Sequence, residues 1–152
     1  MNIRTRAEAK ALGLADLWDR EMARRRVEPL PTYRSKTEAR WARELESLVD
    51  RGEIAAFEYE PERLPLFGKR SYLPDFRVTL NDDRRVWCEV KGYRRKDGIL
   101  KLESAAAKYR DTPFFLVERP RSRWSVRLVH PESGIQPANL YPDEWRTWRW
   151  RR

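Results

Sequence analysis

The sequence is poor in the residues on which several classes of protein depend. It has one cysteine and one histidine among 152 residues, so it can form no internal disulfide and cannot supply the several thiolate or imidazole ligands of a zinc site. A single cysteine fits a reducing compartment. No apolar run approaches the roughly 20 residues of a membrane-spanning helix, and the basic N-terminus lacks the hydrophobic segment of a secretory signal. We also find no glycine-rich phosphate loop and no Ser/His/Asp arrangement.

What the sequence has in excess is positive charge. The chain carries 33 Lys and Arg against 24 Asp and Glu, a net charge of +9, and 40% of its residues are hydrophobic. That hydrophobic content and length suit one domain with one core. A strongly basic chain predicts a polyanionic partner, with nucleic acid first. The alternative is a basic surface without such a partner. Charge alone does not distinguish DNA from RNA as the partner, or cleavage of a nucleic acid from binding to it.

Hydrophobic periodicity predicts a mixed α/β fold, a central mixed sheet with helices packed on it. We expect helices over residues 5–26, 36–51 and 98–109. We expect strands or extended segments over residues 54–60, 63–67, 72–80, 85–93, 113–117 and 124–129. Residues 134–142 are predicted to be loop. Gly13 weakens the first helix, because glycine lowers helix propensity.

The two ends of the chain are predicted to be appendages of a core. Two prolines in residues 28–31 favour an extended linker. We therefore divide the chain into an N-terminal helical arm, a core and a Trp/Arg-rich C-terminal extension, at residues 1–31, 32–130 and 131–152. Trp145 is expected to pack on the core. Trp148 and Trp150 can pack there, on a second subunit, or on unpaired bases.

Three ionisable residues on two neighbouring predicted strands form a candidate site. Asp75 lies on the first strand, and Glu89 and Lys91 lie on the second. Because side chains alternate along a strand, Glu89 and Lys91 share one face. A hairpin whose turn is residues 81–83 places Asp75 opposite Glu89 on that face. A two-residue turn without a bulge would place the two acids on opposite faces, so the hypothesis requires an odd-length turn or a bulge.

Two opposed acids indicate a cation. Directly opposed Cβ atoms are roughly 4.5–5.5 Å apart, and carboxylates that close repel unless a cation lies between them. Oxygen ligands of this kind suit Mg²⁺ or Mn²⁺, which can activate a water against a phosphodiester. Lys91 can hold that water or the developing charge, and the carbonyl of Val90 is a further candidate ligand. The alternative is a surface hairpin with a Glu–Lys ion pair and an aspartate at its edge.

Glu38 is a fourth candidate. The helix predicted over residues 36–51 opens with Ser-Lys-Thr-Glu, a capping-box pattern that begins at Ser35. Glu38 points the same way as Trp41 and Leu45 on the core stripe, so it is aimed at the sheet. Its carboxylate can therefore support a metal, or it can only close the cap, and the sequence leaves both interpretations open.

Basic residues near the predicted site are candidates for contacts with phosphates, which would make binding sensitive to salt. They are Arg34, Lys36, Arg94, Arg95, Lys96, Lys101 and Lys108. The alternative is a solvated basic loop. His130 is expected in a loop rather than in the site, and Cys88 is expected to be a buried, inert thiol.

The motif Pro74-Asp75 … Glu89-Val90-Lys91 resembles that of the PD-(D/E)XK nuclease superfamily. Glu38 matches the acidic residue that many members carry on the helix before the sheet, and the resemblance covers about residues 33–120. It implies a restriction-endonuclease-like core and Mg²⁺ as cofactor, with Mn²⁺ as a substitute. The order of motifs is similar to small phage endonuclease I-type and archaeal-type Holliday junction resolvases, and to the catalytic domain of a heteromeric transposase subunit.

The resemblance therefore implies a metal-dependent, structure-selective DNA endonuclease that resolves four-way junctions as a homodimer. We expect such a protein in the cytoplasm of a bacterial or phage-infected cell. One alternative is a nuclease of transposition, restriction or phage DNA packaging. The other is a basic nucleic-acid-binding module without catalytic activity, in which the acids are structural.

Overall fold

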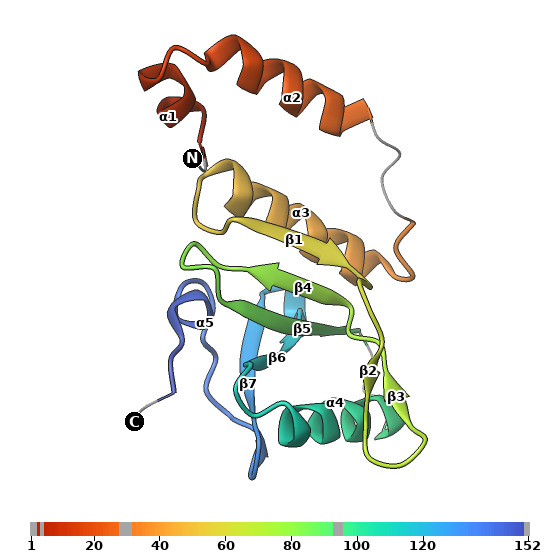
Figure 1. The fold of residues 1–152 in the computed structure, drawn as a ribbon. Coiled ribbons are helices and arrows are strands. Elements are labelled where there is room, and N and C mark those ends of the chain that lie inside the picture. The colour runs from red at the N-terminus through yellow and green to blue at the C-terminus, as the bar shows by residue number, and fades with distance from the viewer. Residues whose placement is uncertain (1–2, 4, 28–31, 93–95, 151–152) are drawn as a thin grey trace.

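A computed structural model describes residues 3, 5–27, 32–92 and 96–150 and contains a central six-stranded mixed sheet flanked by helices (Figure 1). This architecture confirms the predicted mixed α/β class. Along the sheet, the strands are β1 (Ala56–Tyr59), β4 (Phe76–Thr79), β5 (Arg85–Lys91), β6 (Phe114–Glu118), β7 (Ser125–His130) and β8 (Gly134–Ile135). None of the helices in the described residues is long and apolar enough to cross a membrane.

Strands β5 and β6 form the parallel pair of this sheet, and its other described pairs are antiparallel. A parallel connection requires a crossover, which helix α4 (Lys96–Lys108) supplies. Because the two strands run the same way, their last residues lie together, with Lys91 opposite Glu118. The predicted site residues thus fall at the carboxyl end of a central strand.

Helix α3 (Lys36–Asp50) covers one face of the sheet. Its apolar stripe, which includes Trp41 and Leu45, packs against the face of β5 that carries Val86, Cys88 and Val90. Serine 35 caps the helix by accepting a hydrogen bond from a backbone amide in the first turn. The face that the sequence assigned to the core is therefore confirmed.

The opposite face is also covered. Helix α4 and a two-stranded ribbon, β2 (Leu64–Pro65) with β3 (Ser71–Tyr72), pack there around Trp87 and Leu102. The strand predicted over 72–80 is thus divided at Pro74, because proline cannot donate to a sheet ladder. Strand β5 is buried on both faces, so its acidic residue does not lie on an exposed hairpin.

The helix predicted over residues 5–26 is two helices, α1 (Arg6–Ala11) and α2 (Ala15–Val27). The break falls at Gly13, whose φ of +72° lies in the left-handed region that glycine adopts without strain. Residues 28–31, the predicted linker, lie outside the described residues. The division into arm, core and extension stays a prediction.

The C-terminal residues add two elements that the sequence did not predict. Part of the predicted loop 134–142 is strand β8, and residues beyond it form the short helix α5 (Glu144–Thr147). Trp145 on α5 is fully buried, with its ring centroid 5.6 Å from that of Trp41, which confirms its predicted packing role. Trp148 and Trp150 pack at the margin of the same core cluster.

Candidate active site

The turn between β4 and β5 sets the geometry of the site. It is a three-residue turn in which the Leu80 amide donates to the Arg84 carbonyl at 2.8 Å, and Asp83 takes a left-handed φ of 66°. The register that follows pairs Phe76 with Cys88. One step further, the same register places Asp75 opposite Glu89. The odd-length turn that the site hypothesis required is therefore present.

Asp75 lies just before the first paired residue of β4, Phe76. Its carboxylate, rather than a backbone carbonyl of β4, accepts the next hydrogen bond from β5. The Val90 amide donates to Asp75 Oδ2 at 2.7 Å. In this register, positions 75 and 89 form a non-hydrogen-bonded pair, the kind in which opposed side chains approach most closely. The contact with Val90 fixes Asp75 beside Glu89.

Glu89 is 5% exposed and both of its oxygens have partners. Oε1 forms an ion pair with Lys91 Nζ at 2.7 Å, and Oε2 accepts a hydrogen bond from the Tyr72 hydroxyl. Burial and the charge of Glu89 raise the pKa of Tyr72 well above its ordinary value, so the hydroxyl stays protonated as a donor. Lys91 and Tyr72 together compensate and orient a buried carboxylate.

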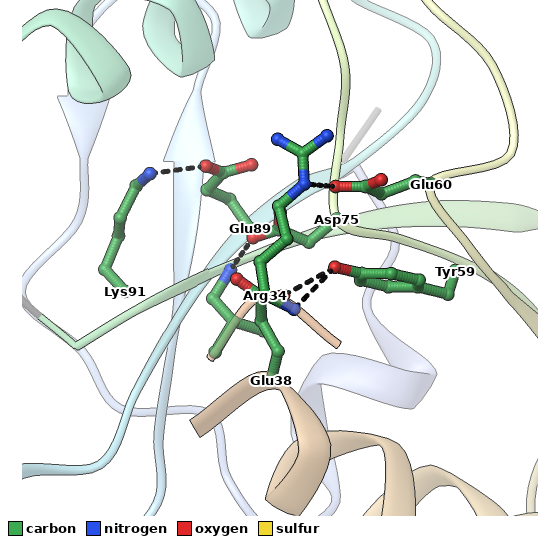
Figure 2. Close-up of polar contacts among 8 residues, drawn as sticks. Arg34, Glu38, Tyr59, Glu60, Asp75, Glu89 and Lys91 are labelled. Carbon is green, nitrogen blue, oxygen red and sulfur yellow. Dashed lines mark hydrogen bonds and ion pairs between the residues drawn. The ribbon is translucent and has the colours of Figure 1, made fainter. Parts of the chain in front are cut away.

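The pKa of Asp75 is raised to about 8. Burial is the largest cause, and the negative charge of Glu89 is the next; Glu38 adds a smaller effect in the same direction, whereas the Val90 amide and Lys91 oppose it. Two strands and a helix therefore bring three acids and one lysine into one electrostatic environment. Figure 2 shows this group with its neighbours Arg34, Tyr59 and Glu60.

Only one of the two hydrogen bonds of the predicted capping box is present at Glu38. Its amide donates to Ser35 Oγ at 3.1 Å, but its carboxylate does not return to the Ser35 amide. Instead, Glu38 Oε2 accepts from the Tyr59 hydroxyl at 2.7 Å and from the Arg34 amide at 3.1 Å. Glu38 is 8% exposed, and among the described residues its Oε1 accepts no hydrogen bond. The capping interpretation does not account for where this side chain points.

Sequence patterns missed Tyr59, Glu60 and Tyr72. Tyr59 and Tyr72 each donate to a site carboxylate, as described above. The Glu60 amide donates to the Asp75 carbonyl at 2.7 Å, and its carboxylate pairs with Arg34 Nε at 3.0 Å. Glu60 has a φ of 43°, an uncommon conformation for a residue other than glycine. The Phe57-Glu-Tyr-Glu alternation could have indicated Tyr59, whereas nothing in the sequence separates Tyr72 from a core tyrosine.

A glycine makes room for the lysine of the site. Gly98 lies in the first turns of α4, where glycine is less favourable than alanine by about 1 kcal/mol. A Cβ atom at this position would lie 2.9 Å from Lys91 Nζ, closer than van der Waals contact allows. The absence of a side chain at Gly98 therefore permits the observed position of the Lys91 ammonium.

The basic residues predicted to bind nucleic acid are partly described. Arg34 and Lys36 are exposed at the start of α3, and Lys101 is exposed on α4. Lys108 donates to the Pro65 carbonyl at 2.9 Å, which ties it to the β2–β3 ribbon. Arg94 and Arg95 lie outside the described residues, and Lys96 is the first residue of α4. Their contacts with nucleic acid stay a prediction.

His130 and Cys88 take no part in this site. His130 ends strand β7, rather than lying in a loop as predicted, and its Nδ1 accepts from the amides of Glu132 and Ser133 at 3.1 and 3.3 Å. It therefore stabilises the turn that follows β7. Cys88 is fully buried, and burial raises the pKa of its thiol, as expected for an inert cysteine.

The acids fit one kind of metal better than others. Within the described residues, no group of three or more acidic, cysteine or histidine side chains is arranged to hold a metal ion. The available donor set is the opposed pair Asp75 and Glu89. A two-carboxylate set suits Mg²⁺, which keeps several of its waters and completes its shell with substrate phosphate. Burial first and the charge of Glu89 second raise the pKa of Asp75, and a bound cation would offset both effects.

Comparisons of the chain with protein-family models, with curated proteins and with solved structures found no match. The interpretation of the site therefore rests on its own residues and geometry.

We predict that Asp75→Asn stabilises the metal-free protein at alkaline pH. The folded-state pKa of about 8 lies above the ordinary value for aspartate, so folding favours the protonated carboxyl. This contribution to stability is complete below about pH 4 and is lost as pH rises through 8. At pH 9 the variant should be more stable than the wild type by about 1–3 kcal/mol. Urea unfolding in EDTA at pH 5 and pH 9 measures the difference.

Asp83→Asn is the matched control, because Asp83 is an exposed aspartate of the same hairpin. The quantity to compare is how far the effect of each variant on the free energy of unfolding changes between pH 5 and pH 9. If the effect of Asp75→Asn changes with pH no more than that of Asp83→Asn, the surroundings of Asp75 do not raise its pKa.

Proposed function

We propose that the chain is a Mg²⁺-dependent DNA endonuclease with a restriction-endonuclease-like core, which hydrolyses phosphodiester bonds. The observation that supports this most is the opposed, buried pair Asp75 and Glu89 with Lys91 two residues further along β5. Burying like charges side by side destabilises a fold, and groups with strongly shifted pKa values concentrate at functional sites. A purely structural pair gives no reason for this arrangement.

Asp75 and Glu89 are proposed to bind the metal directly, with the Val90 carbonyl as a further ligand, while Glu38 supports the metal by holding a water of its shell. Mg²⁺, or Mn²⁺ in its place, supplies positive charge that lowers the pKa of a water and stabilises negative charge on the phosphodiester. Lys91, already beside the acids, is the group that holds the attacking water or the developing charge.

Neighbouring side chains position these groups rather than react. The Tyr72 hydroxyl fixes one oxygen of Glu89, and the Tyr59 hydroxyl fixes one oxygen of Glu38. Arg34 is 69% exposed at the margin of the site, where its guanidinium is paired with Glu60. An arginine in this position can exchange its carboxylate partner for a phosphate of the incoming strand.

The proposed substrate is branched DNA, in particular a four-way junction, and the proposed acting form is a homodimer in the cytoplasm of a bacterial or phage-infected cell. These proposals rest on the resemblance to junction resolvases, in which two symmetric cuts require two active sites. The basic composition supports a DNA substrate of any shape.

The direct test is cleavage of labelled four-way junction, linear duplex and single-stranded DNA, in Mg²⁺ and in EDTA. We expect cutting of the junction only with Mg²⁺. Asp75→Asn and Lys91→Ala should each lower the rate at least roughly 100-fold, since each removes a group that acts in the transition state. The matched controls are Asp83→Asn and Lys69→Ala, which remove the same charges from exposed positions.

Undiminished cutting by Asp75→Asn would contradict the site. Equal cutting of duplex and junction would remove the junction specificity and leave the nuclease. Tight binding without any cutting would favour the non-catalytic binding module.

We further predict that Gly98→Ala separates stability from activity. Alanine favours the helix by up to about 1 kcal/mol, but its Cβ displaces the Lys91 ammonium. The unfolding temperature should stay equal or rise, while the cleavage rate falls roughly 10- to 100-fold, as expected for a misplaced catalytic group. In a Lys91→Ala background, Gly98→Ala should have no further effect on the rate. An equal loss in both backgrounds would show that Gly98 acts by another route.

A further inference from the structure

The turn between β6 and β7 forms an arginine-rich pocket outside the site described above. This β6–β7 turn contains the short 3₁₀ helix η1 (Pro120–Ser122) and borders a pocket of about 700 Å³. The lining residues are Pro120, Arg121, Arg123, Trp124, Ser125 and Asn139. None of them was among the residues predicted to bind nucleic acid.

The positive charge of this turn is not neutralised within the described part of the chain. Arg121 and Arg123 are exposed, and their side chains form no ion pair or hydrogen bond with any described residue. Behind them, Arg119 stacks on the Trp124 ring at 5.2 Å, and its Nε is buried without a hydrogen-bond partner among those residues. Three arginines therefore gather at one turn with no described carboxylate bound to them.

The turn has a costly backbone conformation. Arg121 and Ser122 have φ values of 50° and 62°, and a left-handed conformation costs about 1–2 kcal/mol for each residue other than glycine. The Arg123 amide closes the turn by donating to the Pro120 carbonyl at 3.0 Å, and Asn139 Nδ2 donates to the Trp124 carbonyl at 3.3 Å. Two consecutive residues with positive φ suit the twist of the flanking antiparallel strands, so the β6–β7 hairpin accounts for this backbone and the exposed arginines carry the argument for a ligand.

The pocket adjoins the proposed active site from two directions. Since β5 and β6 are parallel with Lys91 opposite Glu118, the turn begins directly beside the end of β5. Trp124 contacts Trp41 at 4.9 Å between ring centroids, and Trp41 lies one helical turn after Glu38 on α3. A nucleic-acid strand bound at Asp75 and Glu89 could therefore extend to the arginines of the β6–β7 turn.

We propose that the β6–β7 turn is a second phosphate-binding site, in which Arg121 and Arg123 contact the backbone of the DNA strand beyond the cleaved bond. The choice of DNA rests on the proposed function. Guanidinium groups bind phosphate oxygens in a bidentate manner and do not read sequence in doing so. Arg119 lies over the Trp124 ring and Trp41 packs against it at an interplanar angle of 62°, so Trp124 forms a supported wall of the pocket.

The test measures equilibrium binding of a labelled four-way junction and of a linear duplex, with the full chain carrying Asp75→Asn so that no cutting intervenes. The variant is Arg121→Gly with Arg123→Ala, because glycine accepts the left-handed backbone and folding is preserved. Loss of two phosphate contacts should raise Kd roughly tenfold or more and lower the slope of log K against log salt by about 1.8. Arg121→Lys with Arg123→Lys keeps both charges, so it should retain the salt slope, but it should lose part of the affinity because lysine cannot bind a phosphate in a bidentate manner.

The matched control is Arg85→Ala with Arg43→Ala, which removes two exposed arginines outside the turn whose side chains form no ion pair with a described residue. An equal change in Kd and salt slope for control and turn variants would overturn the proposal, since net charge would then explain both. Unchanged binding of both DNA substrates would overturn it as well. If the turn variants alone lose affinity while the wild type cuts no DNA in the cleavage assay, the phosphate-binding site is upheld and the nuclease proposal fails.

Discussion

The register between β4 and β5 is the constraint on which the rest of the site depends. Three residues in the turn, with Asp83 in a left-handed conformation, bring Asp75 opposite Glu89. A turn shorter by one residue would send one acid to the face packed by α3 and leave the other against α4. The number of residues in the turn thus sets the opposition of the two acids, and the burial of β5 on both faces keeps that register from slipping.

Holding two acids together inside a fold has an energetic cost that the neighbouring residues reduce but do not remove. Lys91 and Tyr72 compensate Glu89, and the Val90 amide supports Asp75. The pKa of Asp75 nevertheless stays raised at about 8. Burial and the charge of Glu89 both disfavour the ionised Asp75 carboxylate, and a divalent cation can offset both, so the arrangement that weakens the metal-free fold would strengthen metal binding.

The parts of the site that lie on regular elements could be predicted from the sequence, because alternation and helical phase fix where side chains point. Asp75, Glu89 and Glu38 were found in this way. Tyr72 lies on a two-residue strand, too short to show a period, and its contact with Glu89 depends on how the β2–β3 ribbon folds over the sheet. The β6–β7 turn depends on tertiary contacts with α3, which no local pattern contains. The low helix propensity of Gly13 was apparent in the sequence, whereas its left-handed backbone conformation was not.

The central claim is that the opposed acids form a cation site, and calorimetric titration of the metal-free protein with Mn²⁺ tests it most directly. The account predicts saturable binding by the wild type, strong weakening in Asp75→Asn and in Glu89→Gln, and unchanged binding in Asp83→Asn. Absence of binding by the wild type, or equal binding by all four proteins, would contradict it.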